Sequence, residues 1–506
     1  MLSNMLTKEK LLAQEGEQFP GKTYVEDLLK PVYNDQRDYL FHTMFQIHRA
    51  HVMMLLEQEI LTKEQARTIL QAVEDVSQTD PNTLSYDPSY EDLFFQMEEK
   101  IADKIGKELA GNMHIARSRN DMGVTMYRYV LRERLLLLLQ HVLELRDAIL
   151  EFAQDHVETI MPAYTHTQPA QPTTLGHYLT AVHDLLARDT TRLWNAYRQV
   201  NQSPLGAAAI TTTGFPIDRD STKTSLGFAG LVENSYDAVA GADYLLETAT
   251  AVLVLMSNTG RWLQDFLQLC TREFQAFRVA APYVQTSSIM PQKRNPVSIE
   301  HSRSIASSAV GDAQAAITMM HNTPFGDIVD TEDDLQPHLY SAMEKAKRVM
   351  RLMTVVVRTM EVNREHLLKK SRESYITITE LSDALVREKG LSLRQAHKLC
   401  ANVARTGVAK GMELDEFEPE VFERIAREEL GIDLQLSSEE LKRYADPRTF
   451  IEVRRITGGP NFDETRRMIR VRRSRLEARW NECTAEIRFL QDQDQKLKRK
   501  IQELIS

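Results

Sequence analysis

The sequence predicts an all-α protein of three helical domains around a bundle of long helices. Glycine and proline, which interrupt helices, are scarce at 20 and 17 of 506 residues. Apolar residues recur at three- and four-residue steps, the spacing of one helix face, in five long stretches: residues 125–156, 174–199, 236–274, 297–320 and 338–361. Helices of these lengths would each extend roughly 35–60 Å, as helices of a bundle do.

The long stretches define a central domain, which we place at residues 113–363, between helical domains at 1–112 and 364–506. A chain of 506 residues exceeds one compact domain, so this division fits its length. After the break at 458–460, apolar residues of the tail (about 470–506) follow a four-and-three spacing with Asp494 in one core position. This spacing is typical of a short coiled-coil seam, and equally of a terminal helix that packs on its own domain.

Composition excludes several classes of protein. The net charge of −10 is spread along the chain, which argues against nucleic acid as a partner. Cys270, Cys400 and Cys483 are too far apart for a zinc motif, and so sparse a set fits a reduced compartment. The most apolar run, residues 135–139, is flanked by charges, and the start lacks a secretory signal. We therefore expect a cytoplasmic protein with no membrane partner.

Residues 286–296, Thr-Ser-Ser-Ile-Met-Pro-Gln-Lys-Arg-Asn-Pro, are the most informative segment. They combine Ser287 and Ser288 with Lys293 and Asn295 directly before an expected helix. This mixture suits a site that holds a carboxylate and moves a proton beside it. The alternative, a surface turn that leads into a helix, does not account for the mixture.

Two further segments are polar. Residues 114–121, His-Ile-Ala-Arg-Ser-Arg-Asn-Asp, could grip carboxylates, although a charged helix start with Asp121 near the cap is the simpler interpretation of this segment alone. Residues 164–172 place His166 between hydroxyl groups, where it could carry a proton, although alone it is more simply a structural histidine. Residues 203–219 and 233–239 look structural by composition.

In this order, the segments resemble those of the argininosuccinate lyases, a branch of the fumarase/aspartase superfamily. The likeness covers most of residues 40–470, and its motifs lie at 117–121, 164–172, 215–219, 233–239, 287–295 and 381–390. The family removes an amine from a succinyl group by β-elimination and releases fumarate, and no metal or organic cofactor is implied. The resemblance also implies a homotetramer whose long helices form a shared bundle, with segments of different subunits in each site.

The resemblance assigns roles to individual residues. Ser287 is expected to be the base, and Lys293 to stabilise its alkoxide and the developing dianion. His166, paired with Glu300, is expected to help protonate the departing amine. A larger set is expected to bind the substrate: Arg117, Ser118, Arg119, Asn120, Thr165, Gln168, Ser288, Met290 and Asn295.

Several positions depart from the family pattern. Thr286 stands where the family has glycine, which predicts a different resting shape for the loop. On the amine side, six positions carry replacements for the family's His, Asn, Gln, Tyr, Gln and Lys, in this order: Phe94, Gln96, Met122, Asp327, Glu332 and Leu335. With Asp330, these changes remove a partner for an α-carboxylate and add acids suited to a cationic amine.

We therefore expect the substrate to be an N-substituted aspartate whose amine is not arginine: a diamine, an amino acid or an aminopolycarboxylate. Argininosuccinate lyase proper is the nearest alternative. A non-catalytic structural relative should have lost a base or acid, yet Ser287, Lys293, His166 and Glu300 are all present. A helical scaffold is favoured only by the spacing of the tail and leaves the polar loop unexplained.

Overall fold

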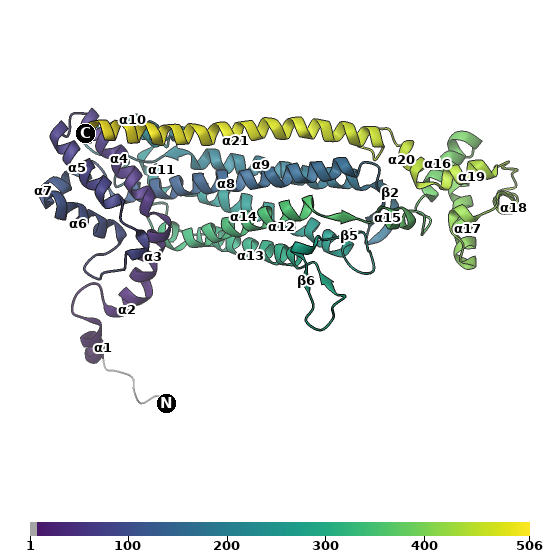
Figure 1. Cartoon of the computed structure of the whole chain (residues 1–506), viewed down its shortest axis with the longest axis horizontal. Helices are drawn as coiled ribbons and strands as arrows, with labels where there is room; N and C mark the ends of the chain where they lie inside the picture. Colours follow the sequence, from purple (N-terminus) through teal and green to yellow (C-terminus); the bar gives the residue numbers. More distant parts are fainter. Residues whose placement is uncertain (1–7) are drawn as a thin grey trace.

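The computed structural model describes residues 8–506 and confirms the all-α class (Figure 1). Five long helices run side by side through the middle of the molecule, and each coincides with one predicted stretch. Their apolar faces meet in one large core, which includes Leu139, Val252 and Met350, all with 0% exposure. The five helices are α8 (Arg119–Asp155), α9 (Leu175–Val200), α12 (Asp243–Leu269), α13 (Val297–Met319) and α14 (Gln336–Arg358).

Two helix boundaries differ from the prediction for local reasons. Helix α8 begins at Arg119 instead of 125 because Ser118 and Asp121 form a capping box, in which the Asp121 carboxylate accepts the Ser118 N–H at 3.0 Å. The helix predicted from residue 236 is broken, so that α11 (Ser235–Ala240) ends before α12 begins. A Cβ at Gly241 would lie 2.6 Å from the Asp237 carbonyl oxygen, so only glycine fits this break.

The N-terminal helices form a second core at one end of the bundle (Figure 1). Ile47, Ile69 and Met97 lie in it with 0% exposure. The helices that precede the bundle are α1 (Lys8–Glu15), α2 (Lys22–Tyr24), α3 (Lys30–Tyr39), α4 (Phe41–Glu57), α5 (Lys63–Ser77), α6 (Leu93–Ile105) and α7 (Lys107–Gly111).

A third core lies beyond the opposite end of the bundle (Figure 1). Leu385, Leu399 and Phe422 are fully buried in it. The helices of this region are α15 (Arg364–Lys370), α16 (Ile378–Lys389), α17 (Leu393–Lys410), α18 (Pro419–Leu430), α19 (Ser438–Ala445) and α20 (Pro447–Glu452). The domain boundaries at residues 112 and 363 stay a prediction.

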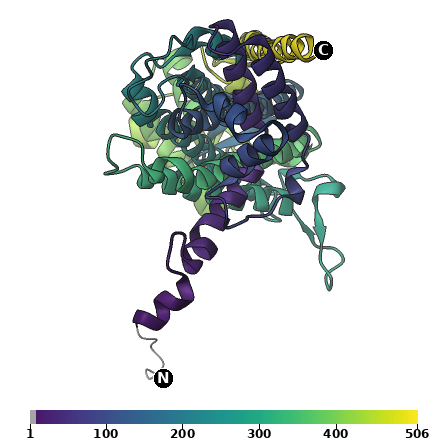
Figure 2. The same ribbon diagram turned by 90° about the vertical axis from the view of Figure 1, so that its left-hand side faces the viewer.

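The tail forms one helix of 44 residues, α21 (Phe462–Ile505), which runs back along the outside of the bundle to the N-terminal helices (Figures 1 and 2). Leu476 and Cys483 join the bundle core, whereas Leu497 and Ile501 join the N-terminal core. The apolar spacing of the tail therefore faces the bundle and the N-terminal helices, and not the helices that precede it. Asp494 is tolerated in this seam because its carboxylate accepts a 2.9 Å hydrogen bond from Gln46.

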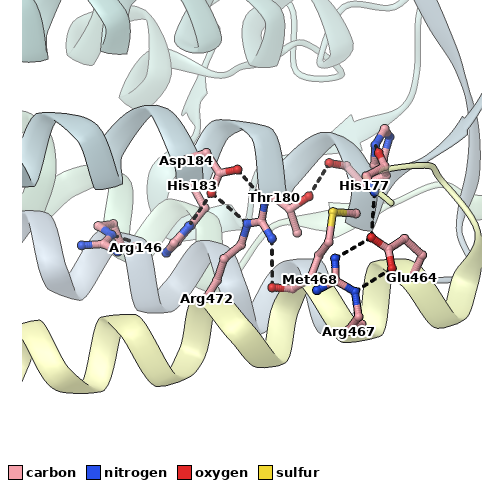
Figure 3. Close-up of polar contacts among 10 residues, drawn as sticks. Arg146, His177, Thr180, His183, Asp184, Glu464, Arg467, Met468 and Arg472 are labelled. Atoms are coloured by element: carbon pink, nitrogen blue, oxygen red, sulfur yellow. Dashed lines mark hydrogen bonds and ion pairs between the residues drawn. The ribbon is translucent and has the colours of Figure 1, made fainter. Parts of the chain in front are cut away.

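Polar contacts join α21 to α9 (Figure 3). Arg472 donates two hydrogen bonds to Asp184, at 2.8 and 2.5 Å. Burial opposes ionisation of Asp184, but hydrogen bonds from His183 and Arg472 outweigh it and lower the pKa of Asp184 to about 2. Further along, the Tyr197 hydroxyl donates a 2.5 Å bond to Glu486 of α21. The Asp184 and Glu486 carboxylates along this contact therefore both accept hydrogen bonds from neighbouring helices.

Strands are few and short among residues 8–506. Two antiparallel hairpins carry predicted site residues, β1 (Ile160–Thr165) with β2 (Gln168–Thr174), and β6 (Gln285–Thr286) with β7 (Arg294–Asn295). The remaining pairs join distant segments, β3 (Gln202–Ser203) with β4 (Gly230–Leu231), and β5 (Phe277–Arg278) with β8 (Glu361–Val362). No helix of the described residues is both long and apolar enough to span a membrane.

Candidate functional site

The segment 286–296 lies on the β6–β7 hairpin, which projects from the side of the bundle beside α13 (Figure 1). Gln285 faces Asn295 and Thr286 faces Arg294 across the two strands. Thr286 is therefore in extended backbone, which suits a β-branched residue, and its replacement of glycine introduces no left-handed residue at this position. Ile289 at the tip is 82% exposed, and Ser288 and Lys293 are exposed, whereas Ser287 and Asn295 are half-buried.

Ser287 is placed to carry negative charge on its hydroxyl oxygen. Its Oγ accepts the backbone N–H of Ile289 at 3.4 Å and that of Met290 at 3.1 Å. Hydrogen bonds to the charged form of a group favour ionisation, so these two amides support an alkoxide at this position. The Lys293 side chain is exposed, and within residues 8–506 its ammonium makes no ion pair.

His166 and Thr167 form the two-residue turn that joins β1 to β2. Both have left-handed backbone, with φ of 51° and 64°, although such turns usually contain Asn or Gly. Thr165 and Gln168 face each other across the turn, and all four side chains are exposed. Left-handed backbone at a β-branched residue is strained, and strain of this kind concentrates at functional sites. The sequence contained no turn motif that would have predicted it.

Ser118 and Asn120 lie at the first turn of α8, as the helix-start interpretation predicted. The Ser118 hydroxyl donates to the Asn120 side-chain oxygen, and the Asn120 amide donates to the carboxylate of Asp327. A helix N-terminus stabilises anions through its free N–H groups and its dipole. This end of α8 therefore already receives one carboxylate from the protein itself.

The two arginines of this segment have different surroundings. Arg119 is exposed and pairs with Asp92 at 3.1 Å and Glu91 at 3.4 Å. Arg117 is only 6% exposed, and its guanidinium donates to His48 at 3.0 Å. Burial lowers the pKa of Arg117 to about 10. The structure places Arg117 in the N-terminal core, away from the surface, and its expected contact with substrate stays a prediction.

Three of the departures from the family pattern build the N-terminal core. The Phe94 ring lies 6.0 Å from that of His48 and is 5% exposed. Gln96 accepts a 2.5 Å hydrogen bond from the Tyr33 hydroxyl, and Met122 is fully buried. Phe94 and Met122 are engaged in packing and offer no surface to an amine, whereas Gln96 is half-buried and its side chain is held by hydrogen bonds with Tyr33 and Ser85.

The acidic departures lie together beside the start of α8. Residues Asp330–Asp334 form a single π-helical turn, a feature that often marks functional sites. Burial, followed by the hydrogen bond and charge of Asp327, raises the pKa of Glu332 to about 9. Burial also raises the pKa of Asp333 to about 6. The sequence pointed to Asp327, Asp330 and Glu332 but not to Asp333, because helical spacing does not reveal which side chains a π turn directs inward.

One chain does not bring these groups together (Figure 1). Helix α8, with 37 residues, puts roughly 55 Å between Ser118 and the β1–β2 hairpin beyond its other end. Helix α13, with 23 residues, puts roughly 35 Å between Glu300 in its first turn and the acidic segment. Among residues 8–506, no hydrogen bond or ion pair joins His166 to Glu300 or to Ser287. The chain therefore carries three separate partial sites.

Known proteins resemble this chain along most of its sequence. A family model described as lyase matches residues 32–311, and one described as argininosuccinate lyase C-terminal matches residues 375–452. Argininosuccinate lyase 2 of Agrobacterium fabrum is 40% identical over 465 residues, which cover 91% of this chain and 92% of the relative. The chain belongs to the argininosuccinate lyase family of the fumarase/aspartase superfamily.

Solved structures agree with this membership. An EDDS lyase variant with bound fumarate is 34% identical, with a TM-score of 0.85 and coverage of 94% of this chain and 95% of that one. The 3-carboxy-cis,cis-muconate lactonizing enzyme of Pseudomonas putida shares only the fold, at 18% identity and a TM-score of 0.70 over 90% of this chain and 99% of that one. The protein is a carbon–nitrogen lyase of the fumarate-releasing superfamily.

Proposed function

We propose that this lyase cleaves an N-substituted aspartate into fumarate and a free amine, and that the amine is not arginine. The observation that carries the proposal is the acidic surrounding of Asn120. The Asp327 carboxylate accepts a hydrogen bond from the Asn120 amide, and Glu332 and Asp333 belong to the adjoining acidic segment. Such a surrounding repels the α-carboxylate that an arginine moiety would bring and attracts a positively charged amine.

The proposed reaction is a β-elimination. Ser287, as the alkoxide, takes a proton from the carbon next to one carboxylate, whose oxygens then carry the developing double negative charge. The electron pair forms the carbon–carbon double bond as the carbon–nitrogen bond breaks. His166, oriented by Glu300, supplies a proton to the departing nitrogen. The amides at the Ser287 oxygen and the ammonium of Lys293 stabilise negative charge in this step.

Substrate binding is proposed to use the remaining polar groups of these segments. Asn295, on β7, and Ser118 with Asn120 are suited to hold the two carboxylates of the succinyl group. To do so, Asn120 must exchange the Asp327 carboxylate for one of the substrate. Thr165, Gln168 and Arg119 are exposed near their respective partial sites and complete the proposed set with Ser288 and Met290.

The distances within one chain support a site shared between subunits. Helix α8 separates Ser118 from the hairpin of His166, and α13 separates Ser287 and Glu300 from the acidic segment beside Ser118, each by tens of ångströms. A homotetramer whose long helices align would bring such segments of different copies together, and we include it in the proposal. Each complete site would then combine partial sites from different copies, and each copy would contribute to several complete sites.

Argininosuccinate lyase itself is the second candidate, favoured by curated relatives of that name at 40% and 34% identity. Purified protein should be supplied with argininosuccinate and with a panel of N-succinylated amines, and fumarate followed by its ultraviolet absorbance. We expect faster turnover of a substrate with a cationic amine. Efficient cleavage of argininosuccinate in preference to the panel would contradict the choice of amine.

The same assay tests the chemistry. Ser287→Ala should lower kcat by about 10³-fold or more, since loss of an essential base removes most of the acceleration. Ser438→Ala is the matched control, because Ser438 is exposed on α19, in a region that carries none of the partial sites. Equal activity of the two variants would refute Ser287 as the base.

A further inference from the structure

A small cavity lies behind the acidic segment, between α3, α8, the π turn and α14. Its volume is about 20 Å³. A space of this size holds one group as large as a water molecule, and it is too small for a whole substrate. Its polar lining is contributed mainly by Asp35, Tyr127, Glu332, Asp333, Gln336 and Tyr340.

Two hydrogen-bond acceptors in this lining are deeply buried and unused. Gln336 is 3% exposed and Tyr340 is 2% exposed. Across the described range 8–506, Gln336 Oε1 and Tyr340 Oη have no hydrogen-bond partner. The Gln336 amide nitrogen donates to the Thr331 carbonyl at 3.1 Å, which directs its oxygen to the other side. A buried polar atom without a partner costs about 1–3 kcal/mol, so an occupant that donates hydrogen bonds would be favoured here.

The acidic side chains around the cavity lack a positively charged partner. Burial raises the pKa values of Asp35, Glu332 and Asp333. Within residues 8–506, no ion pair joins Glu332 or Asp333 to a basic side chain. Arg119 is engaged with Glu91 and Asp92, and the Arg134 guanidinium stacks 4.6 Å from the Tyr340 ring centroid. The acids that line the cavity are left without a direct counter-charge.

We propose that this cavity binds one ammonium group. Gln336 Oε1, Tyr340 Oη and the carboxylates of Glu332 and Asp333 would accept its N–H bonds. Among the described residues, no set of three His, Cys, Asp or Glu side chains is arranged to hold a metal ion, so a hydrogen-bonding cation fits better than a metal. The group would be supplied by a free ammonium ion in solution or by the far end of a diamine substrate.

The second source rests on the proposed function and is supported by a hydrogen-bonded link. Glu332 shares a hydrogen bond with Asp327, and Asp327 accepts one from Asn120, a proposed carboxylate ligand. The cavity is therefore two hydrogen bonds from Asn120, the residue proposed to exchange the Asp327 carboxylate for one of the substrate. A diamine with one nitrogen on the succinyl carbon would direct its other nitrogen toward Glu332, which then gives up its proton.

Calorimetric titration of the full chain with ammonium chloride tests the cavity without any reaction. We expect binding by the wild type, with a heat that depends on the buffer because Glu332 and Asp333 lose protons. Gln336→Met should weaken binding at least tenfold, whereas Gln314→Met, at an exposed position of α13, should leave it unchanged. Tetramethylammonium, which is too large and donates no hydrogen bond, should not bind. Absence of ammonium binding refutes the free-ion source.

Kinetics distinguishes the two sources. N-succinyl-1,3-diaminopropane and N-succinylbutylamine have the same length, and a methyl group replaces the far ammonium in the second. We expect kcat/KM at least tenfold higher for the diamine, and a ratio reduced to about threefold or less in Gln336→Met. Ammonium binding with a ratio near one assigns the cavity to the free ion. If ammonium does not bind and the diamine is not preferred, the inference is overturned, even if both substrates are cleaved. If neither substrate yields fumarate, the proposed function fails for them, and the titration still decides the cavity.

Discussion

Polar groups are buried both in the contact between α9 and α21 and around the cavity beside α14. The two regions differ in whether these groups have partners within the chain. Along α21, the Asp184 carboxylate accepts two hydrogen bonds from Arg472, and the Glu486 carboxylate accepts one from the Tyr197 hydroxyl. Figure 3 shows the first of these contacts. Around the cavity, Glu332 and Asp333 have no ion pair within residues 8–506, and the Tyr340 hydroxyl has no partner there.

The pKa values express the same difference. Hydrogen bonds lower the pKa of Asp184 despite its burial, whereas burial and neighbouring acids raise the pKa of Glu332. Folding alone accounts for the first arrangement, because the Asp184 and Glu486 carboxylates are compensated within the chain. The second arrangement costs free energy in the isolated chain, which is typical of a site prepared for a ligand. The comparison separates a structural polar contact from a candidate binding site in one molecule.

Substitutions that break the compensated contact with α21, at Arg472 and at Tyr197, should produce the largest effects on stability. Arg472→Met leaves the half-buried Asp184 carboxylate without its main partner, and we expect a loss of about 2 kcal/mol, between the values for exposed and buried pairs. Urea denaturation measures this loss. Arg427→Met, which breaks an exposed pair with Asp433, should cost less than about 0.5 kcal/mol. Equal costs would remove the distinction between the two kinds of contact.

Two buried tyrosines provide a matched comparison, since Tyr197 and Tyr340 are each 2% exposed. Tyr197→Phe removes a hydrogen bond to a carboxylate and should cost about 1.5–3 kcal/mol. Tyr340→Phe removes a hydroxyl that has no partner in the described chain and should be neutral or stabilising by about 1 kcal/mol. Differential scanning calorimetry in ammonium-free buffer compares the two. A larger loss for Tyr340→Phe would show that its hydroxyl is already satisfied.

The cavity should make stability fall with pH. Asp333 has its pKa raised from 3.8 to about 6, so the folded state holds this proton more tightly than the unfolded state. Its contribution is fully present below pH 3.8 and is lost as pH rises through about 6. Asp333→Asn should therefore stabilise the protein by about 1 kcal/mol at pH 8 and have little effect near pH 4. Stabilisation of the same size at both pH values would contradict a titrating Asp333.

Glu332→Gln should show the same linkage over a wider pH range. The pKa of Glu332 is raised from 4.5 to about 9, so between these values the folded state keeps a proton that the unfolded state has lost. Glutamine resembles the neutral carboxyl group in size and polarity but does not titrate. We therefore expect little change in unfolding free energy near pH 4 and a stabilisation of up to about 1 kcal/mol at pH 7. Denaturant unfolding at the two pH values measures this, and the absence of any stabilisation at pH 7 would show that the pKa of Glu332 is not raised.

Much of the fold could be predicted because helical periodicity is a local property of the sequence. The five long helices lie where apolar residues recur at three- and four-residue steps. Their ends were less predictable, because the Ser118 cap and the Gly241 break depend on individual hydrogen bonds and close contacts. The motifs likewise indicated the superfamily and its chemistry. They did not show that Arg117 is buried or that Phe94 and Met122 pack in a core.

The amino-acid sequence by itself determined the helices, the family and the residues able to perform an elimination, since each depends on neighbouring residues or on a short motif. Tertiary structure alone decided the surface against which α21 packs, through contacts such as Arg472 with Asp184, 288 residues apart. It also decided which acids surround the cavity, because a π turn and three separate helices converge there. Burial and pairing of charges depend on these long-range contacts, which no local pattern encodes.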